Sequence, residues 1–166
     1  SDAILDEIVQ NEKYNKYYPK VQVGFELKQS DIERVQKSIQ MSISPIQDYY
    51  RLGYCVSNIN IEKVIETLKL FSKCKETDDI IINTLHILYF NKRKDENLDI
   101  YARNCIASLD YKDRGNTNNH INYEIEQVAQ ECFSKENGEK QAEIVFEKFV
   151  ELIKEKGISY YEYSYI

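Results

Sequence analysis

The chain has 166 residues, of which 42% are hydrophobic and 30% charged, with a formal net charge of -6 and a pI of about 5.1. That length is typical of a single domain, residues 1–166, with a hydrophobic core of its own. The diffuse acidic charge disfavours nucleic acid as a partner, and no apolar run approaches the roughly 20 residues that span a membrane.

The cysteines and histidines have no recognisable spacing. Neither a CxxC zinc site nor a redox motif occurs among the four cysteines, Cys55, Cys74, Cys105 and Cys132. Cys105 and Cys132 fall on apolar stripes of predicted helices, as small, reduced core residues do. This favours a cytoplasmic protein, with disulfides in an exported protein as the alternative. The two histidines lack metal-ligand spacing as well, so we expect no metal and no cofactor.

The N-terminal segment predicts a helix followed by a strand. From Asp2 to about Lys13, the residues Leu5, Ile8 and Val9 recur at helical spacing. In the run KVQVGFELK, apolar residues alternate with polar residues or glycine from Val21 to Leu27. This period of two is typical of a half-buried strand.

The middle of the chain predicts a succession of amphipathic helices. Ser30 and Glu33 have the spacing of a capping box, and Asn60 can cap a further helix. The run IIINTLHILYF is apolar nearly all round, so we expect it to form a central helix. The apolar stripes predict that eight side chains share one core: Leu85, Leu88, Tyr101, Ala102, Cys105, Ile106, Phe146 and Phe149.

The C-terminal segment predicts a second strand, from Ile158 to Ile166. It follows Gly157 and is rich in aromatic residues, which favour strands. A lone strand leaves its backbone unpaired, so we expect a mainly α fold with a small sheet in which this strand pairs with Val21 to Leu27. The alternative is an open edge offered to a partner. The partner-binding residues expected here are Tyr160, Tyr161, Tyr163 and Tyr165.

One stretch resembles a tetratricopeptide repeat. Tyr49, Leu52 and Gly53 have the spacing of that family's first helix, in which an aromatic residue precedes Leu-Gly. A second unit, from His86 to Leu109, has Ala102 where the family has alanine. The resemblance implies stacked helix pairs and a surface that binds peptides, as in a peptide-sensing regulator.

A different motif resembles the active site of HEPN ribonucleases. Arg114 and His120, separated by five residues, are similar to that family's R-x4-6-H signature. The resemblance implies acid–base chemistry on RNA, and loss of RNA cleavage on changing either residue would identify it. The intervening residues are typical of a polar loop, which is the alternative. With neither a phosphate-binding loop nor a GxSxG motif, we expect no enzyme activity and no catalytic residue.

Bulk properties favour a non-enzymatic binding protein. The small size, the acidic charge and the 14 tyrosines resemble those of bacterial immunity proteins, which neutralise a basic toxin or nuclease domain by occluding it. This likeness is one of composition, and tyrosine is enriched at protein interfaces. We therefore expect a basic protein as partner, and neither nucleic acid nor a membrane. The sequence does not predict an oligomeric state.

Overall fold

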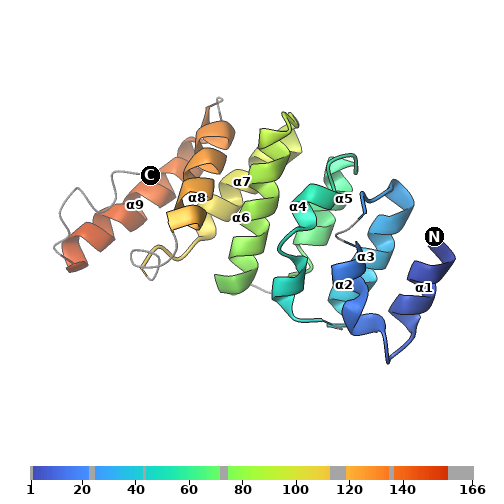
Figure 1. Ribbon diagram of the computed structural model, residues 1–166. Helices are drawn as coiled ribbons and strands as arrows, with labels where there is room; N and C mark the ends of the chain where they lie inside the picture. The colour runs from blue at the N-terminus through green and yellow to red at the C-terminus, as the bar shows by residue number, and fades with distance from the viewer. Residues whose placement is uncertain are drawn as a thin grey trace. The chain divides into compact units, whose positions relative to one another are not determined.

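Figure 1 shows the computed structural model of the chain. It describes residues 2–22, 25–42, 44–71, 75–112, 119–134 and 137–156. The described backbone is mainly helical, as predicted, and contains no helix that is both long and apolar enough to cross a membrane. The chain divides into two compact units, Ser1–Asn91 and Lys92–Ile166, called the N-terminal and C-terminal units below.

The described residues of the N-terminal unit form six helices and three short 3-10 turns. The helices are α1 (Asp2–Gln10), α2 (Tyr18–Gln22), α3 (Ile32–Gln40), α4 (Leu52–Cys55), α5 (Ile61–Leu68) and α6 (Lys75–Phe90). The 3-10 turns are Asn15–Tyr17, Gln29–Asp31 and Ile46–Tyr49. Helices α1, α2 and α3 contact one another, α3 also contacts α5, and α4 packs against α6 (Figure 1).

Helix α6 is central to this unit, as its sequence predicts. Ile82, Leu85 and Leu88 are completely buried. Gly53 of α4 lies so close to α6 that a β-carbon on it would be 2.8 Å from Ile87 Cδ1 and 3.0 Å from Thr84 Cα. The glycine therefore sets the distance between the two helices, because any side chain would push them apart.

The predicted cap at Asn60 is confirmed, and the predicted cap at Ser30 is wrong. Asn60 Oδ1 accepts hydrogen bonds from the backbone N–H groups of Glu62 (2.8 Å) and Lys63 (3.4 Å). Ahead of α3 the carboxylate of Asp31 is used instead, and it accepts the backbone N–H of Lys28 at 2.9 Å. The extra 3-10 turn moves the start of α3 beyond Ser30.

The described part of the C-terminal unit contains the helices α7 (Glu96–Ser108), α8 (Asn119–Phe133) and α9 (Glu139–Lys156). Helix α7 contacts both α8 and α9. Asp95 caps α7, and the buried Arg103 donates from Nη1 to the Cys132 carbonyl of α8 at 3.1 Å. Lys148 of α9 donates to two carbonyls at the other end of α7, where a cation is favoured by the helix dipole.

The predicted two-stranded sheet is wrong. Val21 and Gln22, two of its residues, belong to α2, and the part of the chain that the structure describes has no strand. Pro19 suits the first turn of that helix, and the Tyr18 hydroxyl donates to Gln22 Oε1 at 2.9 Å, one turn further on. Residues 157–166, which include the predicted C-terminal strand, lie outside the described residues.

The predicted core is correct in part. Leu85, Leu88, Ala102 and Ile106 are buried, each in its own unit, while Tyr101, Cys105 and Phe149 are half-buried. The prediction for Phe146 is wrong, because this side chain is 68% exposed. Helix α9 carries two adjacent apolar stripes, and the other one contains Leu152, which is buried, and Phe149, which is half-buried.

Candidate partner-binding groove

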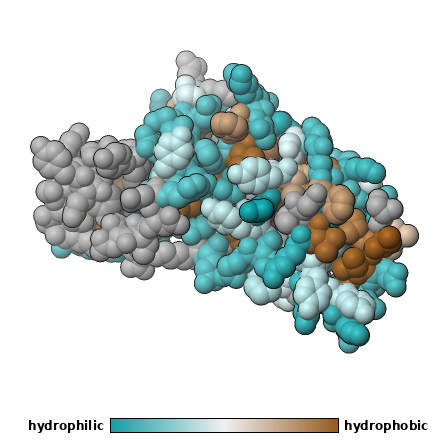
Figure 2. Space-filling view, viewed as in Figure 1, coloured by the Kyte–Doolittle hydropathy of each residue, from teal (hydrophilic) through white to brown (hydrophobic). Residues whose placement is uncertain are grey.

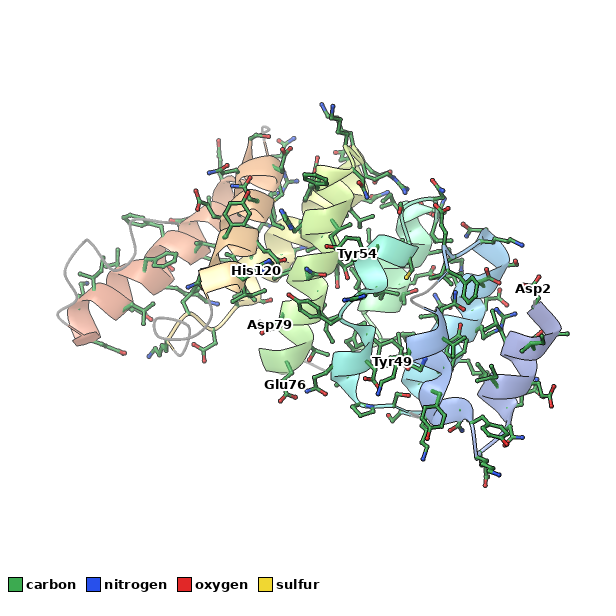
Figure 3. The ribbon with its side chains drawn as sticks, viewed as in Figure 1. Asp2, Tyr49, Tyr54, Glu76, Asp79 and His120 are labelled. Atoms are coloured by element: carbon green, nitrogen blue, oxygen red, sulfur yellow. The ribbon has the colours of Figure 1, made fainter. Side chains whose placement is uncertain are left out.

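The residues predicted to form functional sites are mostly outside the described part of the chain. This holds for the four tyrosines of the tail, Tyr160, Tyr161, Tyr163 and Tyr165, and for Arg114. His120 is described at the start of α8, where its side chain is exposed and its Nδ1 lies 3.3 Å from Glu124 Oε1 (Figure 3). The contact observed for His120 is therefore with a carboxylate of the same helix, α8.

The N-terminal unit has a groove between α1 and the segment that joins α2 to α3. It has a volume of about 250 Å3. Its floor and walls are apolar: Ile4, Leu5, Ile8, Val21 and Phe25. Gln22 also lines it, and charged residues stand around it: Asp2, Glu26, Lys28 and Asp31. We call this the α1 groove.

The pattern of α1 explains one wall of the α1 groove. Leu5 and Val9, four residues apart, are buried against the rest of the unit. Ile4 and Ile8 form the adjacent row, also four residues apart, and this row lines the groove. Packing of α1 against the rest of the unit buries only the row that contains Leu5 and Val9, so Ile4 in the adjacent row is 63% exposed.

The facing wall comes from the segment that was predicted to be a strand. Phe25 lies just beyond α2 and is 60% exposed, whereas Leu27 is buried and donates its backbone N–H to the Cys55 carbonyl at 2.9 Å. A strand would place Phe25 and Leu27 on the same face, whereas in the structure Leu27 is buried and Phe25 lines the groove. Figure 2 shows the apolar area as a brown patch over the N-terminal helices, at the right of the view.

The groove is framed by an ionic contact that is buried at Asp31 and exposed at Asp6. Arg34 of α3 donates from Nε to Asp6 Oδ1 of α1 at 2.7 Å and from Nη1 to Asp31 Oδ1 at 3.0 Å. Burial lowers the pKa of Arg34, but the hydrogen bonds to Asp6 and Asp31 outweigh that and raise it further above its ordinary value. The guanidinium therefore stays charged and holds α1 against the start of α3.

The charge around the groove is predominantly negative. Asp31 is neutralised by Arg34, which leaves Asp2 and Glu26 opposed by Lys28. Asp2 lies at the N-terminal end of α1 (Figure 3), and Glu26 accepts a hydrogen bond from the side-chain amide of Asn58. An apolar group with a positive neighbour complements this arrangement.

No protein-family model, curated protein or solved structure matches the chain. Fold class alone does not specify function, so the chemistry of the site is the basis for assigning one.

A second depression, in the C-terminal unit, is more polar. It has a volume of about 410 Å3 and is lined in part by Lys112, Lys148 and Glu151. Its two ammonium groups are engaged, because Lys148 donates to the Ala107 and Leu109 carbonyls and Lys112 pairs with Glu155 at 3.0 Å. No group of residues suited to hold a metal ion occurs in the described ranges.

The volume of the α1 groove indicates what it can hold. Pockets for whole small molecules usually measure about 300–1,000 Å3. At about 250 Å3, this groove suits one large apolar side chain and its immediate neighbours. Sequence reasoning missed the site, although one signal was present: α1 carries a second apolar row, Ile4 and Ile8, beside the row that it buries.

Proposed function

We propose that the chain is a non-enzymatic protein-binding module whose α1 groove receives an apolar side chain of a basic partner. The observation that carries this proposal is the exposure of Ile4 and Phe25 at facing walls of one groove. Contiguous exposed apolar surface is rare on soluble proteins unless it serves binding. An anchor residue buried in such a pocket commonly supplies most of the binding energy.

The charge of the chain supports a basic partner. The formal net charge is -6, and Asp2 and Glu26 place negative charge beside the apolar walls. Long-range attraction of this kind speeds association and selects against acidic partners. An inhibitor or immunity protein that blocks a basic toxin or nuclease domain in the cytoplasm is the specific role that we favour.

The ionic contacts of Arg34 with Asp6 and Asp31 also support a binding role. Arg34 fixes α1 to α3 before any partner arrives, so the groove is preformed. A preformed site binds more tightly because less conformational freedom is lost on association.

The experiment is a selection of displayed peptides on the full chain, followed by affinity measurement on variants. We expect the selected peptides to place a large apolar residue beside Lys or Arg. Binding should weaken about tenfold or more on Ile4→Gln and on Phe25→Ser, since each removes apolar contact area. Tyr54→Ser is the matched control, because Tyr54 is 65% exposed in the same unit and does not line the groove (Figure 3).

Two outcomes would contradict the proposal. One is the selection of acidic peptides, which the negative rim should repel. The other is equal affinity for the wild type, Ile4→Gln and Phe25→Ser, which would place the binding surface elsewhere. Circular dichroism of each variant checks the fold, and both side chains are exposed enough for the helices to form without them.

A further inference from the structure

Helix α9 exposes an apolar face of its own. Phe146 is 68% exposed and Ile153 is 54% exposed. With Ala142 and Val150 they form a row at spacings of three and four residues, which lies along one side of the helix. This row runs for about three turns, and we call it the α9 face.

The contacts of α9 fix which way this row points. Leu152 is buried, the Phe149 ring lies 4.8 Å from that of Tyr111, and Lys148 reaches the end of α7. Gln141 donates to Asn104 of α7 at 3.2 Å. These inward groups lie on another side of the helix from Phe146 and Ile153, so the α9 face is left exposed.

Glutamates accompany the α9 face along its other flank. They recur every four residues and are all exposed: Glu139, Glu143, Glu147, Glu151 and Glu155. Glu155 pairs with Lys112, while Lys140 and Lys154 lie among the others. Carboxylates outnumber ammonium groups along this flank. Like charges at this spacing repel, so the helix gains nothing from the row by itself.

We propose that the α9 face is a second interaction surface, which takes a basic amphipathic helix of a protein partner. Apolar residues of that helix pack on Phe146 and Ile153, and its Lys or Arg residues lie against Glu143 and Glu147. Helix-in-groove recognition uses anchors at the same spacings of three and four residues. The observation is independent of the α1 groove, since it concerns other residues in the other unit.

Charge also argues against a second copy of this chain as the occupant. Antiparallel pairing of two α9 helices brings like flanks together, which would place glutamates against glutamates. In parallel pairing the acidic flank of one copy would meet the flank that α7 already covers. A basic partner helix meets neither obstacle.

The test uses two synthetic peptides and isothermal titration calorimetry on the full chain. One peptide is a helix with leucines on one face and lysines on the other, and its matched control has glutamate at each lysine. We expect the lysine peptide alone to bind. Its affinity should fall about tenfold in Phe146→Ser and severalfold in Glu143→Lys, and should decrease with added salt. Ile100→Ser is the control, because Ile100 is exposed on α7 of the same unit.

A further variant separates this surface from the α1 groove. Phe25→Ser removes binding of the lysine peptide at the α1 groove and should leave its binding at the α9 face intact. Binding that is lost in Phe25→Ser and kept in Phe146→Ser would overturn the proposal. Equal binding of both peptides would overturn it as well. A dimer in sedimentation experiments that Phe146→Ser dissociates would show that a second copy occupies the face. Tighter binding after removal of residues 157–166 would show that the chain's own tail does.

Discussion

Arg34 and Asp6 form a 2.7 Å hydrogen-bonded ion pair that joins α3 to α1 across 28 positions of the sequence. Helix α1 has only nine residues, fewer than an isolated helix needs for stability in water. Its place therefore depends on the burial of Leu5 and Val9 and on this ion pair. The Arg34–Asp6 ion pair therefore helps to hold α1, which forms one wall of the α1 groove.

Replacing Arg34 with methionine should destabilise the protein and weaken groove binding together. The change leaves the buried Asp31 carboxylate without its guanidinium, which costs about 1–3 kcal/mol. Urea denaturation measures the loss of stability, and peptide affinity measures the effect on the groove. Lys63→Met is the control, because Lys63 makes an exposed ion pair with Glu66 and its loss should leave the midpoint unchanged. Unaltered affinity in a destabilised Arg34→Met would show that the groove does not depend on this contact.

Gly53→Ala should destabilise the N-terminal unit by about 1–3 kcal/mol, because the new methyl group would meet the α6 backbone. The nearest backbone atom, Thr84 Cα, would be 3.0 Å away and cannot move without shifting the helix. Thermal melting provides the measurement. Gly138→Ala is the matched control. The nearest atoms to its methyl group would belong to the side chains of Phe133 and Arg103 rather than to a helix backbone, so we expect a smaller loss. A melting temperature that Gly53→Ala leaves unchanged would mean that α4 and α6 are not in close contact.

The protein should lose stability in alkaline solution. Burial raises the pKa of Tyr18 above its ordinary value of 10.0, and burial raises that of Tyr49 as well. The unfolded chain then releases these protons near pH 10 while the folded chain keeps them. The contribution of these two tyrosines to the free energy of unfolding should be constant up to about pH 10 and decrease above it. The buried thiols of Cys55 and Cys132, whose pKa values burial also raises from an ordinary value of 9.0, add a decrease that begins near pH 9. Urea midpoints measured between about pH 8 and pH 11 should show the decrease, and Tyr18→Phe should reduce it. An identical pH profile in Tyr18→Phe would show that this phenol is not responsible.

The described thiols should react slowly with alkylating agents in the folded protein. Burial raises the pKa of Cys132 to about 12 and also raises that of Cys55, so little reactive thiolate forms near neutral pH. Cys105 is half-buried and should react first of these three. Mass spectrometry after timed alkylation gives the order. None of the three forms a disulfide. After denaturation without reductant we expect four modified cysteines, and fewer would indicate a disulfide.

Elements that follow from local chemistry could be predicted from the sequence. The cap at Asn60 depends on residues two and three positions away, and the burial of Leu85 and Leu88 follows from the all-round apolar character of α6. The alternation from Val21 to Leu27 was misleading. Val21 and Gln22 end helix α2, and a run of seven residues that begins at a helix end can show the same apolar pattern as a strand.

Features that depend on tertiary contacts could not be predicted. Ile4 and Phe25 face one groove only because α1 folds back onto the α2–α3 segment, a contact between separate elements. Phe146 was placed in the core because α9 has two apolar stripes, and periodicity alone cannot decide which one α7 covers. Local patterns thus assigned Phe25 to a sheet and Phe146 to the interior, and they gave Ile4 no role.

The most direct test of the central claim is the effect of a selected basic peptide on the backbone amide NMR spectrum of the full chain. If the α1 groove binds the partner's apolar side chain, the largest shift changes should lie in residues 2–8 and 25–31. They should disappear in Phe25→Ser and persist in Tyr54→Ser. Shift changes confined to other residues, with 2–8 and 25–31 unaffected, would contradict the account.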